Sequence, residues 1–118
     1  MKKSIMILSV IILALGSAVW ASTLTVMWDK NTEADLAGYR LYQSDTSGKY
    51  SYGEDHAIAT APAGEETVTV NDVEDGTWFW VLTAYDTSGN ESGPSNEVTK
   101  TIDTEAPNAP RITITIER

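Results

Sequence analysis

The sequence contains no cysteine, and its only histidine is His56, which lies in the acidic stretch GEDHAI. The absence of cysteine excludes a disulfide framework, a thiol nucleophile and a lipid-modified cysteine anchor. With one imidazole and no G-x-S-x-G segment, the residues do not supply a Ser-His-Asp or Cys-His triad. The carboxylates fall in polar turns, so the fixed carboxylate pair of a glycosidase is not indicated either. We therefore expect a protein that is not an enzyme and uses no cofactor.

Basic residues are also scarce, and two of them, Lys2 and Lys3, stand directly before the apolar run IMILSVIILALG. The segment SAVWAS follows this run and places Val19 and Ala21 three residues and one residue before a possible cleavage point. A basic start, an apolar run and small residues at those places form the pattern of a secretory signal peptide. We predict a signal peptide over residues 1–21. An uncleaved membrane anchor is the alternative, because the apolar run is nearly long enough to span a bilayer.

The charge balance limits the classes of partner. The whole chain has 8 basic and 17 acidic residues, and cleavage would leave 6 basic residues and a net charge of −11. Such a surface repels nucleic acid and anionic lipid, so we expect no nucleic-acid partner and no membrane association after cleavage. We expect a location that is secreted, periplasmic or on the cell surface. A disulfide-free domain of about 100 residues must then rely on its hydrophobic core.

After residue 21 the apolar residues alternate with polar ones, which is the period of β-strands rather than of helices. The alternating segments are TLTVMW, GYRLYQ, ETVTVNDV, TWFWVLTAY, SNEVTKTI and RITITI. Turn-forming stretches such as DKNTEAD and DTSGNESGPS separate them. Short alternating strands at this spacing predict an all-β sandwich.

Several features occur in an order typical of one domain family. Trp28 takes the place of a core tryptophan in a second strand, DLAGYRLY follows as a third strand, and Val73 precedes DG at a corner. The series WFWVLTA, then Gly89 and SNEV, completes the set. In this order the sequence resembles a bacterial fibronectin type III domain. The resemblance implies an immunoglobulin-like β-sandwich of about seven strands over residues 22–102.

The sequence departs from that family at two places. Trp78 stands where the family usually has a tyrosine whose hydroxyl is hydrogen-bonded to backbone near the corner. An indole can donate a hydrogen bond but cannot accept one. The family's first strand normally precedes TLTVMW by about ten residues, whereas here the predicted signal peptide runs almost directly into the second strand. We therefore expect the first strand to be missing.

Residues 103–118 look like the linker and opening strand of a following module. The stretch DTEAPNAP is a stiff, proline-bearing linker. Ile112, Ile114 and Ile116 alternate with threonines and predict an extra strand. This strand could pack on its own domain, stay loose, belong to a truncated module, or add to the sheet edge of a second copy. The last alternative would make the chain a structural subunit that associates with itself.

The aromatic residues divide into two faces. Alternation predicts that Trp78 and Trp80 lie in the core. The outward-facing aromatics are a hypothetical ligand-binding set: Tyr42, Phe79, Tyr85, Tyr50 and Tyr52. Exposed aromatic faces stack on sugars or contact proteins, although they can also simply cover a sheet. We predict a non-catalytic, secreted module that mediates protein or carbohydrate interaction at the cell surface. A fragment of a multi-module extracellular enzyme is a further alternative.

Two acidic loops carry oxygen ligands at alternating positions, which invites comparison with a calcium site. Asp29 begins the first loop, DKNTEAD, and Asp86 begins the second, DTSGNES. Neither has the glycine at the sixth position and the distal glutamate that complete a calcium loop. Asx turns account for Asp and Asn in such loops, so we expect no metal site.

Overall fold

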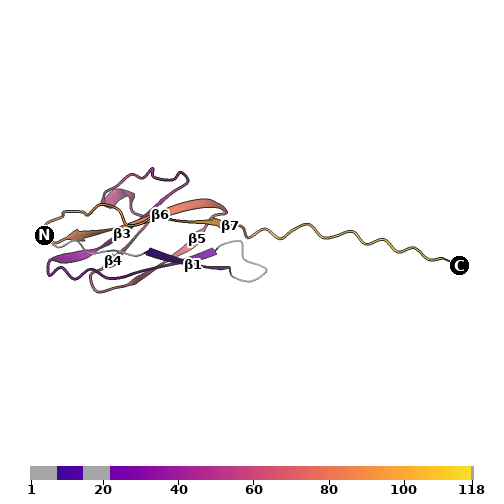
Figure 1. Cartoon of the computed structure of the whole chain (residues 1–118), viewed down its shortest axis with the longest axis horizontal. Coiled ribbons are helices and arrows are strands. Elements are labelled where there is room, and N and C mark those ends of the chain that lie inside the picture. The colour runs from indigo at the N-terminus through magenta and orange to yellow at the C-terminus, as the bar shows by residue number, and fades with distance from the viewer. Residues whose placement is uncertain (1–7, 15–21, 118) are drawn as a thin grey trace.

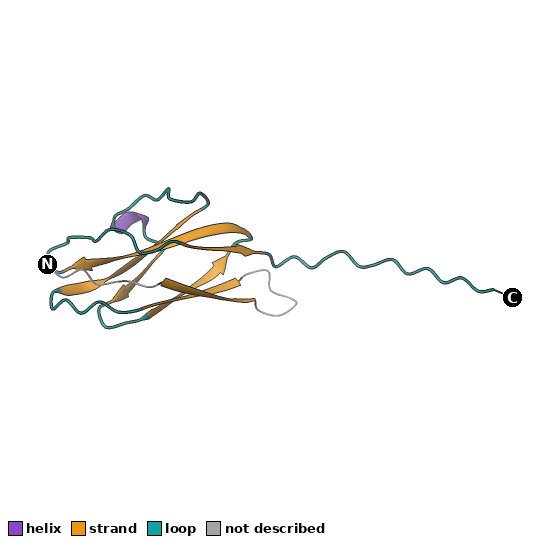
Figure 2. Cartoon of the chain, in the orientation of Figure 1, coloured by secondary structure: helices purple, strands orange, loops and turns teal. Residues whose placement is uncertain are grey.

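The computed structural model describes residues 8–14 and 22–117, and in this part of the chain two antiparallel β-sheets pack face to face (Figures 1 and 2). One sheet has three strands in the order β1-β2-β5: β1 Leu8–Ala14, β2 Ser22–Trp28 and β5 Thr67–Val73. The other has four in the order β4-β3-β6-β7: β4 Ala59–Pro62, β3 Leu36–Ser44, β6 Gly76–Asp86 and β7 Val98–Ile102. A 3-10 helix, η1 (Glu54–His56), lies in the loop before β4. The predicted all-β, immunoglobulin-like sandwich is confirmed.

The core lies between the sheets and is built from the alternation that the sequence displays. Leu24, Val26 and Trp28 of β2 are buried and face Tyr39 and Leu41 of β3 across the sandwich. From β6, the buried residues of the same cluster are Trp80, Leu82 and Ala84. Burying each large side chain contributes about 1.5–3 kcal/mol, so these strands hold the sheets together without a disulfide.

Trp78 packs at the margin of the core and forms the corner hydrogen bond of the fold. It is half-buried, and its Nε1 donates to the carbonyl oxygen of Glu74 at 2.9 Å. Gly76, between the two residues, has φ 144°, a conformation that favours glycine. The Trp78 indole therefore donates a hydrogen bond to the corner backbone, in place of the hydrogen bond that the tyrosine hydroxyl makes in the resembled family.

The structure corrects the expectation that the first strand is missing. Leu8–Ala14 forms β1, which pairs antiparallel with β2 in a register that sets Leu8 opposite Trp28 and Ala14 opposite Ser22. The physical reason is that an apolar run of that length supplies backbone donors and acceptors to an edge of β2 that is otherwise open. Residues 1–7 and 15–21 of the predicted signal peptide lie outside the described residues, so its cleavage stays a prediction.

The expectation of a strand at Ile112, Ile114 and Ile116 is also wrong for this chain alone. Residues 103–117 contain no assigned strand and run away from the sandwich as an extended segment (Figure 1). A strand needs a partner for its backbone groups, and nothing in the described residues pairs with this segment beyond Thr104. Within the described part of the chain, no helix has the length and apolar character needed to cross a membrane.

Candidate functional site

The candidate site lies on the face of the four-stranded sheet that points away from the core. Two loops cover the middle of this face: residues 50–53, which follow β3, and residues 91–94, which follow β6. Tyr42 was expected to be exposed here, and the structure corrects this: only 1% of it is accessible. It lies under Tyr52, whose ring meets it edge to face with the centroids 5.0 Å apart.

Glu91 is the centre of a hydrogen-bonded network on this face. Its Oε2 accepts hydrogen bonds from the hydroxyls of Tyr42 and of Thr83, the latter at 2.6 Å. Its Oε1 accepts one from Arg40 Nη1 at 3.1 Å, which is also an ion pair. Tyr42 Oη in turn accepts from the backbone N–H of Gly53 at 3.0 Å. The network therefore fastens both covering loops to the sheet.

The electrostatics of the network favour an ionised Glu91. Burial alone would raise the pKa of Glu91, but the hydrogen bonds from Thr83 and Tyr42 and the charge of Arg40 outweigh it and hold the pKa below its ordinary value. Burial, and then the hydrogen bond to Glu91, raise the pKa of Tyr42. The pair is thus a carboxylate and a neutral phenol at neutral pH, which is the combination that charge-assisted hydrogen bonds stabilise.

Arg40 connects this network to Tyr85. Its guanidinium carbon lies 4.1 Å from the centroid of the Tyr85 ring, within the range of a cation–π contact. Tyr85 is half-buried. The arginine therefore has a carboxylate on one side and an aromatic face on another, and its position is fixed by both.

A second carboxylate, Glu97, fixes the loop that carries the remaining tyrosines. It accepts hydrogen bonds from Ser47 Oγ, from the backbone N–H of Gly48 at 2.8 Å and from Tyr50 Oη at 2.6 Å. Burial, and then the hydrogen bond to Glu97, raise the pKa of Tyr50. The Tyr50 and Tyr52 rings lie 6.1 Å apart, so this loop presents two neighbouring aromatic rings.

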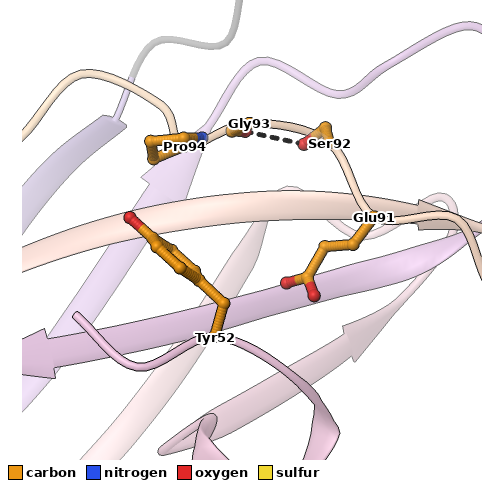
Figure 3. A pocket seen from close by; sticks show the side chains of 5 residues that line it. All are labelled: Tyr52, Glu91, Ser92, Gly93 and Pro94. Atoms are coloured by element: carbon orange, nitrogen blue, oxygen red, sulfur yellow. Dashed lines mark hydrogen bonds between the residues drawn. The ribbon is translucent and has the colours of Figure 1, made fainter.

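A shallow hollow of about 360 Å³ opens beside Tyr52 (Figure 3). Its lining residues are Tyr52, Glu91, Ser92, Gly93 and Pro94. In Figure 3 the Tyr52 ring and the Glu91 carboxylate face each other across the hollow, with the backbone of residues 92–94 above them. Tyr52 is 43% exposed, the largest exposed fraction among the aromatic residues of the face. An aromatic wall, a carboxylate and a small-residue loop thus meet at one place.

The predicted ligand-binding set is only partly assembled. Tyr42, Tyr50 and Tyr52 are brought together, and Tyr85 is linked to them through Arg40 and Glu91. Phe79 is not: it lies on the same face opposite Ser44 of β3, but among the described residues it makes no ring contact with these side chains and does not line the hollow. We therefore restrict the candidate site, called the tyrosine cluster below, to Tyr42, Tyr50, Tyr52, Tyr85, Arg40 and Glu91.

Sequence reasoning missed the two charged residues that organise this site. The sequence pattern does not single out either of them, because Arg40 lies within the alternating segment GYRLYQ and Glu91 within the acidic loop DTSGNES. The signal available was the outward alternation of Arg40 and Tyr42 on one strand with Thr83 and Tyr85 on another. Glu91 lies in a loop and is positioned by an isolated β-bridge with Tyr85, which no local sequence pattern predicts.

The acidic loop after β6 is organised as a turn. Asp86 accepts hydrogen bonds from the backbone N–H groups of Ser88 at 2.9 Å and of Asn90 at 2.8 Å, as the predicted Asx turn requires. The Asn90 side chain bonds the same carboxylate, and these bonds lower the pKa of Asp86. His56 is exposed in η1. Among the described residues, no three His, Cys, Asp or Glu side chains are placed to hold a metal ion.

Comparison with known proteins identifies the fold. No family model and no curated protein matches the sequence. A crystal structure of the chicken CNTN1 FN1-FN3 domains is similar over 78% of this chain, with a TM-score of 0.56 and 18% sequence identity. The fold is fibronectin-like. The Clostridium perfringens spore cortex lytic enzyme SleM is similar over 79% of this chain, with a TM-score of 0.54 and 17% identity. This chain spans 30% of the first structure and 26% of the second, and at these identities the likeness concerns the fold alone.

Proposed function

We propose that the chain is a non-catalytic, exported binding module that contacts a carbohydrate or protein partner at the cell surface through the tyrosine cluster. The observation that carries this proposal is the hollow between Tyr52 and Glu91, where the Tyr52 ring is 43% exposed and packs on the buried Tyr42. The Tyr42 hydroxyl donates to Glu91, and Glu91 in turn forms an ion pair with Arg40. The cost of ordering this surface is met within the domain, before any partner binds.

A carbohydrate is the partner that the hollow fits best. One face of a sugar ring is apolar and stacks on an aromatic side chain, while its hydroxyls donate to carboxylates and bond to serine hydroxyls. Tyr52 offers the ring, Glu91 Oε1 retains capacity to accept, and Ser92 lies on the rim. The volume of about 360 Å³ is at the lower end of small-molecule sites, which suits one or two sugar units.

Two observations support a location outside the cytoplasm. The first is the predicted signal peptide, and the second is the strong excess of acidic residues, which keeps an exported module soluble. One of the structures that share the fold is a spore cortex lytic enzyme, of which this chain corresponds to about a quarter. A domain of this fold can thus occur within a longer lytic enzyme. A fragment of a multi-module extracellular enzyme therefore remains the second candidate for this chain.

A glycan array tests the proposal directly. The exported protein, its Tyr52→Ala variant and its Phe79→Ala variant are compared, because Phe79 is an aromatic of the same face that lies outside the hollow. We expect binding that Tyr52→Ala lowers at least tenfold and that Phe79→Ala leaves unchanged. Circular dichroism confirms that each variant is folded. Binding that survives Tyr52→Ala would refute the site, and a blank array would direct the search to protein partners with the same two variants.

A further inference from the structure

Residues 111–117, with the sequence RITITIE, have the pattern of a strand and lack a partner strand among the described residues. Ile112, Ile114 and Ile116 are 84%, 77% and 81% exposed. Alternating isoleucine and threonine is the composition of a strand with one buried face and one solvated face. Left alone, the segment exposes apolar side chains and a row of unpaired backbone groups. Pairing with a sheet edge would bury the side chains and provide hydrogen bonds for the backbone groups.

The β1 position is an edge of matching length. β1 spans seven residues, the segment Ile112–Glu117 spans six, and among the described residues the only strand partner of β1 is β2. Every second place along β1 lies opposite a buried residue of β2, namely Trp28, Val26 and Leu24. Leu8, at the first of these places, is itself 3% exposed and part of the core. A strand seated here therefore completes the hydrophobic core.

The present occupant suits that edge less well than RITITIE does. Apart from Ser9, the β1 segment, LSVIILA, is apolar at both alternate sets of places, and Ile11 and Leu13 fall opposite the outward threonines of β2. In RITITIE the corresponding places hold threonine and glutamate. An apolar run without alternation is, however, what the central part of a signal peptide requires. If residues 1–21 are removed on export, the domain loses β1 and β2 becomes an open edge.

Chain direction decides which copy can fill that edge. Leu8 and Asn96 are joined by two hydrogen bonds, so β1 begins beside the residues that lead into β7. The two strands run the same way, because Ala14 pairs with Ser22, Ser22 pairs with Val73, and Gly76, just after Val73, pairs with Ile102 at the end of β7. The chain leaves β7 after Ile102, at the end of the domain where β1 finishes. To enter β1 from its beginning, its own tail would have to return about 23 Å along the domain. The eight linker residues reach about 26–29 Å only when fully extended, and the chain would also have to reverse direction twice, once after Ile102 and once before it enters the β1 position. The few ångströms to spare leave little room for two reversals, so a second copy is favoured over the chain's own tail.

We propose that residues 112–117 of one copy occupy the vacated β1 position of a second copy and pair antiparallel with β2. Ile112, Ile114 and Ile116 then lie opposite Trp28, Val26 and Leu24 of the acceptor, and the threonines face solvent. In such a pair the donor keeps a free edge and the acceptor keeps a free tail, so the contact is head to tail and propagates into an open chain of subunits. The inference shares with the proposed function only the export step, and it uses a different surface of the domain.

Disulfide trapping tests the register, since the chain has no cysteine of its own. The proposed pairing sets Thr115 of the donor opposite Thr25 of the acceptor. Facing residues of antiparallel strands have Cα atoms about 4.5–5.5 Å apart, which is within the range of a disulfide. We expect the exported Thr25→Cys/Thr115→Cys protein, verified by mass to begin at Ser22, to form a ladder of covalent multimers that a reductant dissolves.

The matched control is Thr25→Cys/Thr113→Cys. A tail that folds back onto its own domain runs in the reverse direction and sets Thr113 opposite Thr25, which gives a disulfide within one chain. A ladder from the first pair and none from the second supports the proposal. A monomeric disulfide from the second pair, no disulfide from either, or an exported product that retains residues 8–14 overturns it.

Light scattering after size exclusion provides an independent measurement. Ile114→Lys places a charge at the centre of the inward set, whereas Thr113→Lys places the same charge on the outward set. We expect the wild-type exported protein and Thr113→Lys to elute as multimers. The fraction of Ile114→Lys that elutes as multimers should be at least tenfold lower than that of the wild type. Equal elution of the two lysine variants would contradict the proposal.

Discussion

The two sheets differ in how their outer faces and edges are organised. The four-stranded sheet carries the tyrosine cluster, in which two loops are fastened to the strands by Glu91 and Glu97. The three-stranded sheet has a simpler outer face, where Thr23 and Thr25 are half-exposed and Met27 is 44% exposed. Its edge strand comes from an apolar segment that the sequence predicts to be removed. The first sheet is thus complete in itself, and the second depends on what occupies one edge.

This difference separates two kinds of specificity. On the four-stranded sheet, long-range hydrogen bonds fix side chains in one arrangement, which suits a binding surface that must be ready before its partner arrives. On the three-stranded sheet, backbone pairing and a row of aliphatic residues accept any strand of the right period and polarity. A surface of the first kind recognises a particular partner, while an edge of the second kind permits exchange of strands.

The largest effect should come from breaking the core under the four-stranded sheet. Trp80 is fully buried, and its Nε1 donates to Gln43 Oε1 at 2.8 Å. Trp80→Ala removes the largest buried side chain and is expected to lower the free energy of unfolding by about 3–5 kcal/mol. Urea denaturation measures this loss. Thr77→Ser, at an exposed position of the same strand, keeps the hydroxyl that is hydrogen-bonded to Thr101 and should change stability by less than about 0.5 kcal/mol.

A second substitution tests the close contact between β3 and β4. A Cβ atom at Gly38 would lie 2.6 Å from the carbonyl oxygen of Ala61 and 2.9 Å from Tyr85 Oη. The backbone oxygen cannot move without loss of the β3–β4 pairing, so Gly38→Ala should cost about 1–3 kcal/mol in thermal or urea unfolding. Gly93→Ala is the control, because nothing lies within 4 Å of its added Cβ. Equal stability of the two variants would contradict this account.

Much of this contrast could be predicted from the sequence, and the missed parts have physical reasons. Period-two alternation correctly placed Leu24, Val26 and Trp28 of β2 in the core, because each strand has one buried face. It missed β4, whose sequence ATAP has small residues and a proline and is held mainly by backbone pairing to β3. It also missed β1, because the same apolar run is read as a signal peptide.

The candidate site was harder to predict than the fold. Alternation put Tyr42 on the correct face, but its burial depends on Tyr52 and on Glu91, which is 49 residues away in sequence. Contacts made by loops are set by tertiary packing, which no local period records. The sequence could therefore name the aromatic face, whereas only the structure names the carboxylates that organise it.

Glu91→Gln should weaken the four-stranded sheet in a pH-dependent way. The variant loses the ion pair with Arg40 and the charge in the hydrogen bonds from Thr83 and Tyr42, which we expect to cost about 1–2 kcal/mol at pH 7. Because the pKa of Glu91 is lowered in the fold, its stabilisation is fully present above the unfolded pKa of about 4.3. It is lost as pH falls through the folded pKa.

Urea titrations at pH 7 and at about pH 3 measure that dependence. The difference in unfolding free energy between wild type and Glu91→Gln should shrink at the lower pH as the wild-type carboxylate becomes protonated. Glu65→Gln, which changes an exposed glutamate, should match wild type within about 0.5 kcal/mol at both pH values. A difference for Glu91→Gln that stays constant with pH would mean that its charge does not organise the cluster.

The smallest effect is expected at the corner that joins the two sheets, between β5 and β6. Trp78→Phe keeps an aromatic ring but removes the N–H that donates to Glu74, so it should cost about 1 kcal/mol. Trp78→Tyr restores a donor of the kind that the resembled family uses and should recover part of that loss. If tyrosine and phenylalanine are equally destabilising, the indole acts here through its packing against the core. The corner would then be held by Gly76 and by the buried side chain of Val73 rather than by a hydrogen bond.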